Sequence, residues 1–137
     1  MRRYATCLWL VPAVAMALMA CSSSKTPELD PNIAPTNYKQ EILDTLMNTL
    51  GDPTNLRDAY ISDPMLTSTG VNQRYTACVR FNPRDASRRY TGSTDRIAYF
   101  YGGHLNQLVE ATKEQCSNAA YKPFPELEKL CLANKCN

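Results

Sequence analysis

Few residues of this sequence have the chemistry needed for catalysis. Its 137 residues include one histidine, His104, and a nucleophilic hydroxyl or thiol usually needs a histidine as its base. His104 directly follows Gly102-Gly103, where a polar residue leaving a turn needs no catalytic explanation. Paired carboxylates such as Asp58 and Asp63 could act as the catalytic pair of a glycosidase, but a domain of roughly 100 residues has little surface from which to build a cleft that encloses a sugar chain. We therefore expect a protein without enzymatic activity, and a hydrolase that uses His104 is the less favoured alternative.

The sequence also lacks the motifs that hold cofactors or metal ions. It contains no phosphate-binding glycine loop, no zinc-protease motif and no dinucleotide fingerprint. Zinc sites need several cysteine and histidine ligands at close spacing, whereas the sequence has no C-x-x-C pair and a single imidazole. Neither a cofactor nor a metal site is predicted, so the six cysteines must have another role.

The N-terminal residues have the pattern of a secretory signal peptide. Arg2 and Arg3 precede an apolar run over residues 7–20, and the polar sequence begins at Cys21. The run contains Pro12 and is shorter than the roughly 20 residues that a membrane-spanning helix needs. We therefore expect residues 1–20 to be a signal peptide that is removed.

The end of this segment, Leu18-Met19-Ala20-Cys21, resembles the lipobox of bacterial lipoproteins. The resemblance implies cleavage between Ala20 and Cys21, a diacylglycerol on the Cys21 sulfur and acylation of the new amine. Such an anchor is effectively permanent, because each buried CH₂ contributes about 0.8 kcal/mol. Ser22, in place of the aspartate that retains enteric lipoproteins at the inner membrane, implies the outer membrane with the domain facing the periplasm. The alternative is ordinary secretion with Cys21 left as a thiol.

Cysteine parity agrees with lipidation. Cys7 lies in the expected signal peptide and Cys21 takes the lipid, which leaves four cysteines for the folded chain: Cys78, Cys116, Cys131 and Cys136. In an oxidising compartment an even number predicts two disulfides, with three pairings open. Cys131 and Cys136 are near enough in sequence to close a local loop, which would pair Cys78 with Cys116 across the domain.

The charge of the chain after cleavage is balanced. Without Arg2 and Arg3, 13 basic residues face 13 acidic ones, so no overall basic field predicts a nucleic-acid partner. Arginines nevertheless gather at 74–96, and Arg84, Arg88 and Arg89 could bind an anionic partner such as lipopolysaccharide phosphate or an acidic protein. Alternatively they pair with the acidic segment 28–63 within the fold. A solvated loop that binds nothing specific is the favoured interpretation.

Proline spacing and hydrophobic periodicity divide the chain into a tether over residues 21–37 and one domain over residues 38–137. The predicted fold class is α+β, with one amphipathic helix packed on an antiparallel sheet of three to four strands and stabilised by disulfides. Gly102-Gly103 predicts a two-residue hairpin. The predicted elements are a helix over 38–50, strands over 56–62, 73–81, 96–101 and 104–111, and a short C-terminal helix over 125–132.

Segments between residues 52 and 92 resemble a group of small bacterial envelope proteins without an assigned activity. The matching segments are Asp52-Pro53, Arg57-Asp58, Cys78-Val79-Arg80-Phe81-Asn82 and Tyr90-Thr91-Gly92. This resemblance implies no functional residue. The expected anchor, the tether and the absence of catalytic groups predict a periplasm-facing interaction or assembly module whose partner is an envelope protein or glycan. The alternative is a small disulfide-stabilised inhibitor or ligand-binding protein.

Overall fold

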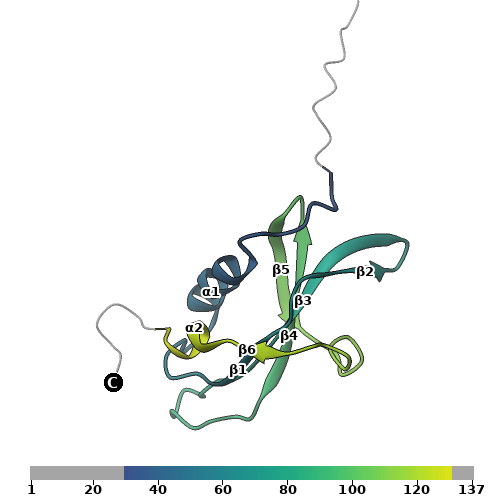
Figure 1. Ribbon diagram of the computed structural model, residues 1–137. Coiled ribbons are helices and arrows are strands. Elements are labelled where there is room, and N and C mark those ends of the chain that lie inside the picture. Colours follow the sequence, from purple (N-terminus) through teal and green to yellow (C-terminus); the bar gives the residue numbers. More distant parts are fainter. Residues whose placement is uncertain (1–29, 131–137) are drawn as a thin grey trace, which may run out of the picture.

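The computed structural model describes residues 30–130, which form an antiparallel sheet with a helix packed on one face (Figure 1). The predicted α+β class is confirmed, but the sheet has six strands rather than three to four. The order is β5-β4-β3-β1-β6, and β2 pairs with β3 beside this path. The elements are α1 (Tyr38–Thr49), β1 (Arg57–Ile61), β2 (Met65–Thr69), β3 (Asn72–Asn82), β4 (Thr94–Tyr101), β5 (His104–Glu110), β6 (Lys122–Pro123) and α2 (Pro125–Glu128).

The main core lies between α1, α2 and one face of the sheet. Residues spaced by three and four along α1 share one face of a helix, and alternate residues of a strand share one face of a sheet. The buried side chains of this core come from both, and they include Ile42, Leu43, Leu46, Ala77, Val79, Phe81, Phe100, Phe124 and Leu127. The strand predicted over residues 73–81 is found within β3, whose residues alternate between the two faces, with Cys78 in a separate cluster on the face opposite Val79.

Two strands were missing from the sequence-based prediction. Strand β2 reads Met-Leu-Thr-Ser-Thr, which has no apolar alternation, and it forms by pairing with Asn72–Thr76 of β3. Strand β6 has two residues and pairs with Tyr60 and Ile61 of β1. Strands β2 and β6 have no alternating apolar pattern of their own and form only because a neighbouring strand supplies their hydrogen-bond partners, so they could not be predicted from their own residues.

The turn between β4 and β5 has the predicted two-residue form. Gly102 and Gly103 both have positive φ, 57° and 82°, which side chains with a Cβ rarely adopt. A Cβ on Gly103 would also lie 3.0 Å from Cγ2 of Ile33. The Gly102 N–H donates to the Pro31 carbonyl, so residues 30–37, which the sequence assigns to the tether, pack against the domain.

The C-terminal helix is shorter than expected and ends at Glu128. Its carboxylate accepts the Ala59 N–H, and the Phe124 N–H donates to the Ala59 carbonyl, so α2 is fixed to an irregular part of β1. Cys131 and Cys136 lie outside the described residues. Within residues 30–130 no helix has the length and apolar character to cross a membrane.

Candidate functional site

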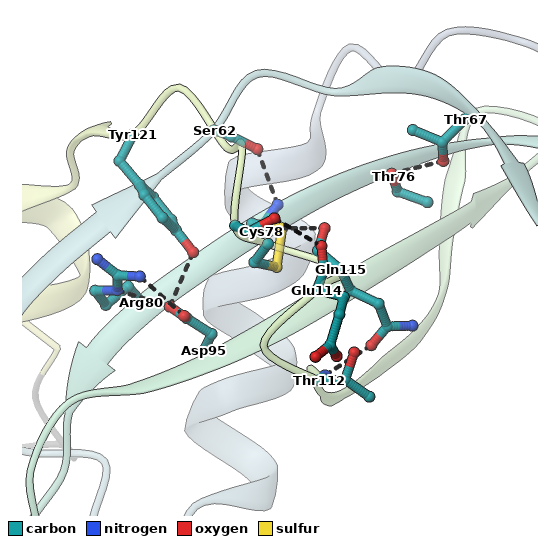
Figure 2. The surroundings of a disulfide bond; sticks show 12 residues. Ser62, Thr67, Thr76, Cys78, Arg80, Asp95, Thr112, Glu114, Gln115 and Tyr121 are labelled. Carbon is teal, nitrogen blue, oxygen red and sulfur yellow. Dashed lines mark hydrogen bonds and ion pairs between the residues drawn. A yellow bond between two sulfur atoms is a disulfide. The ribbon is translucent and has the colours of Figure 1, made fainter.

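The sheet face opposite α1 is partly covered by the β5–β6 loop, residues 111–121. A disulfide between Cys78 of β3 and Cys116 of this loop joins the two, with Cα atoms 5.9 Å apart (Figure 2). The expected pairing of these two cysteines is thus found in the structure. Both side chains are buried together with Ile97, while Tyr99 and Tyr121 pack around them. The disulfide thereby holds a loop without regular structure at a defined place on the sheet.

A second attachment fixes the end of the same loop. Arg80 binds both carboxylate oxygens of Asp95, at 2.7 and 2.9 Å, and the Tyr121 hydroxyl donates to Asp95 at 2.8 Å (Figure 2). The Arg80 guanidinium also lies 4.5 Å from the centre of the Tyr121 ring. The hydrogen bond from Arg80 lowers the pKa of Asp95, whereas burial is the main cause that raises the pKa of Tyr121. At neutral pH the phenol is therefore a donor and the carboxylate is ionised.

Between the loop and β2 the sheet face is hollowed into a groove of about 180 Å³. Its lining residues come from the β1–β2 region, β3 and the loop: Ser62, Asp63, Met65, Thr67, Thr76, Cys78, Glu114, Gln115, Asn118 and Ala119. A neighbouring hollow continues along β2 past Ser68 and Thr69 and shares Thr67, Thr76 and Gln115 with the first. We call the two hollows together the β2 groove.

The polar side chains in the β2 groove are held in fixed directions. The hydroxyls of Thr67 and Thr76 are 2.9 Å apart across the β2–β3 pair (Figure 2). The Gln115 amide donates to the Tyr99 hydroxyl at 2.9 Å, and its oxygen accepts the Thr112 N–H at 2.8 Å. Such pre-organised donors and acceptors reduce the entropy that a bound partner must lose.

Two carboxylates, those of Glu114 and Asp63, line the groove. The Glu114 carboxylate accepts a hydrogen bond from its own backbone N–H and a second one from the Thr112 hydroxyl. Both lower the pKa of Glu114, the first more than the second, so this carboxylate is ionised at neutral pH. Asp63 also has a lowered pKa, chiefly through its hydrogen bond from Lys122, which forms an ion pair with it. Among residues 30–130 the ion pairs include no cation for Glu114. Glu114 is thus an ionised, exposed carboxylate at the rim of the groove.

Strand β2 borders this groove and has a free edge. Within the described part of the chain it pairs with β3 only. Its five residues carry no charge, and Met65 and Leu66 are exposed. An unpaired strand edge presents backbone N–H and C=O groups that can accept another strand.

The three candidate arginines lie in different surroundings. Arg84 forms an ion pair with Asp52 at 2.8 Å, and its side chain is only 18% exposed. Arg89 pairs with Asp85 and is exposed, and Arg88 is exposed with φ of 61°. Pairing of the acidic segment with the arginine-rich segment, one of the expected alternatives, is thus found for Arg84. Arg88 and Arg89 are the two that face solvent.

His104 lies on β5 and has a structural partner. Its Nδ1 is 3.0 Å from a carboxylate oxygen of Glu41, whose second oxygen accepts the Leu105 N–H. Glu41 therefore ties α1 to β5. In residues 30–130 no serine, threonine or cysteine side chain forms a hydrogen bond with His104, and no three ligand-type side chains are grouped for a metal ion.

No protein-family model, curated protein or solved structure matches the chain. The two resemblances stated from the sequence therefore stay predictions. The groove residues themselves were missed by sequence reasoning. The expected pairing of Cys116 with Cys78 was the one available signal, since it implied that residues near 116 lie on the sheet.

Proposed function

We propose that this protein is a lipid-anchored bacterial envelope protein whose domain binds an extended polypeptide segment of an envelope partner. Cys21 carries the anchor, in the outer membrane and facing the periplasm. The observation that carries the binding proposal is the uncharged free edge of β2 beside a groove with fixed polar groups. No catalysis and no nucleic acid are part of the proposal.

Recognition would combine backbone and side-chain contacts. A segment that adds to β2 gains main-chain hydrogen bonds along five residues, and its alternate side chains point toward the groove. Thr67, Thr76 and Gln115 supply hydroxyl and amide groups there, and Glu114 supplies the charge that favours lysine or arginine. The expected partner segment is thus extended, largely uncharged and carries one basic residue.

A glycan partner would use the same hydroxyl and amide groups, but it would make no use of the strand edge. The inhibitor or ligand-binding alternative would likewise use the groove without the edge. An anionic partner at Arg88 and Arg89 has less support, because Arg89 already pairs with Asp85 and Arg84 pairs with Asp52.

The anchor is tested by the intact mass of the unreduced protein extracted from its host with detergent. We expect residues 21–137 plus three acyl chains and a glycerol, less four hydrogens for two disulfides. A mass without lipid contradicts the anchor and favours a secreted protein with an odd thiol.

The binding site is tested by photo-crosslinking in intact cells, with p-benzoylphenylalanine in place of Leu66. Val109 on the opposite edge strand, β5, is the matched control, because both side chains are 44% exposed. We expect a crosslinked peptide of an envelope protein from position 66 and none from position 109. Equal capture at both positions, or capture of a glycan alone, contradicts strand addition at β2.

Charge selection is tested in the same crosslinking experiment with Glu114→Gln. We expect roughly a two- to fivefold lower yield, the size of an exposed ion pair, and a weaker salt dependence. Glu110→Gln on β5 removes an exposed carboxylate outside the groove and is the control. An unchanged yield with Glu114→Gln contradicts the cationic partner.

A further inference from the structure

Three segments lie at one end of the sheet: the residues that precede α1, the β2–β3 hairpin and the turn between β4 and β5. Thr76 of β3 lies opposite Tyr99 of β4, and Tyr101 lies opposite His104 at the start of β5. By this register, the start of β3, the end of β4 and the start of β5 share one end of the sheet. In Figure 1 the dark blue segment before α1 crosses this end, beside the turn between β4 and β5.

Contacts place the entering segment beside the β2–β3 hairpin as well. The Pro31 carbonyl accepts the Gly102 N–H, and Ile33 packs against Gly103. A hollow is lined by Pro31 and Asn32 from this segment, Tyr101 from β4, and Asn72, Gln73 and Arg74 from the hairpin. The first described residues, the hairpin and the β4–β5 turn therefore form one surface, which we call the entrance end.

The entrance end carries exposed apolar side chains. Val71 occupies the second position of the two-residue turn between β2 and β3, after Gly70 with φ of 68°, and it is 100% exposed. Ile33 and Tyr101, elsewhere on the entrance end, are also exposed. Residues 64–76 include no acidic side chain and one basic one, Arg74. A protruding apolar tip without negative charge is suited to the interface of a membrane with anionic lipids.

The short stretch of chain between Cys21 and the domain favours the bilayer, rather than another protein, as the partner of the entrance end. Nine residue steps separate Cys21 from Asp30, so the entrance end lies within about 30 Å of a lipid attached to Cys21. A tether of this length gives a high effective concentration of the tip at the membrane surface. Insertion of a single valine favours membrane contact over no contact by roughly tenfold. This is enough to orient a domain that is already tethered to the membrane, although it could not recruit a free protein.

We propose that the entrance end rests on the bilayer surface, with Val71 inserted among the lipid headgroups and Ile33 and Tyr101 facing the same surface. This inference depends on the proposed anchor at Cys21. It orients the domain so that α2 and the arginine-bearing loop over residues 83–91 point away from the membrane. The β2 groove, which begins near the hairpin, then lies within reach of segments that leave the same membrane.

Tryptophan fluorescence can test this orientation. The only tryptophan of the sequence is Trp9, in the segment expected to be removed, so Val71→Trp gives the lipidated protein a single reporter. Val109→Trp is the control, because Val109 lies opposite Ile97 toward the far end of β5, about 17 Å along the strand from His104. Each lipidated variant, without residues 1–20, is isolated from its host and placed in phosphatidylethanolamine and phosphatidylglycerol vesicles with brominated acyl chains.

We expect the emission of Val71→Trp to shift to shorter wavelength and to lose roughly half its intensity to the brominated lipid, while Val109→Trp changes little. Failure of Val71→Trp to be quenched, in a protein that floats with the vesicles, overturns the membrane contact and leaves the anchor intact. Equal quenching of both variants overturns the orientation. A blue shift that depends on protein concentration, without quenching, assigns the tip to a second copy and also overturns the inference. A protein that does not float refutes the anchor itself.

Discussion

The disulfide between Cys78 and Cys116 should supply a large share of the stability of this domain. The two residues are 38 positions apart, and closure of such a loop in the unfolded chain corresponds to about 4 kcal/mol at 25 °C in the chain-entropy model. We expect the double variant Cys78→Ala/Cys116→Ala to lose about this free energy of unfolding. Both side chains are buried, so lost packing adds to the effect.

A matched control separates loop closure from the mere loss of two sulfurs. Cys131 and Cys136, which we expect to pair, are five positions apart. The same relation gives about 2 kcal/mol for so short a loop. The variant Cys131→Ala/Cys136→Ala should therefore cost about half as much as the Cys78→Ala/Cys116→Ala variant.

The measurement is urea unfolding followed by far-UV circular dichroism, with and without reductant. The reduced wild-type protein should lose more stability than either double variant, since it loses both bridges. Equal losses for the two double variants, or a loss below about 1 kcal/mol for the 78/116 variant, refute the loop-closure reasoning. The crosslink from position 66 should also weaken in the 78/116 variant, because Glu114 and Gln115 depend on this bridge for their position.

Two further outcomes follow from single contacts. Because the pKa of Asp95 is lowered in the folded protein, ionisation of Asp95 stabilises the fold at pH values above the unfolded pKa of about 4, and this stability is lost as pH falls through the folded pKa. The variant Asp95→Asn should therefore be less stable than the wild type at pH 7. It should also lose less stability than the wild type between pH 6 and pH 3, as measured by urea midpoints. Gly103→Ala should cost about 1–2 kcal/mol from positive φ alone and more from the contact with Ile33. Gly70→Ala has positive φ but open space around it, so a cost equal to that of Gly103→Ala would contradict a role for the Ile33 contact.

The elements that sequence reasoning found share a local cause. Helix α1 has its apolar residues at helical spacing, β3 alternates, and Gly102-Gly103 has the backbone freedom that its turn requires. Each of these signals is contained within about a dozen residues. The α+β class could be predicted from them, whereas the number of strands could not, because β2 and β6 have no such pattern and form against β3 and β1.

The candidate site was beyond sequence reasoning for a related reason. Thr67, Thr76 and Glu114 are ordinary polar residues of a strand, another strand and a loop, and only the folded chain brings them to one groove. The arginines show the same limit. Arg84 and Arg88 have the same chemistry in one segment, but Asp52 lies beside Arg84 alone, so one is held in the fold and the other faces solvent.

The amino-acid sequence by itself determined the N-terminal pattern ending at Cys21, the even set of four later cysteines, the periodic elements and the glycine turn, because each is a property of neighbouring residues. Tertiary structure confirmed the favoured pairing of Cys78 with Cys116. It alone decided that the edge of β2 is free and that the segment before α1 lies against the turn between β4 and β5. These depend on distances between segments that are far apart in the chain. Such distances follow from packing and strand register, which no single stretch of sequence contains.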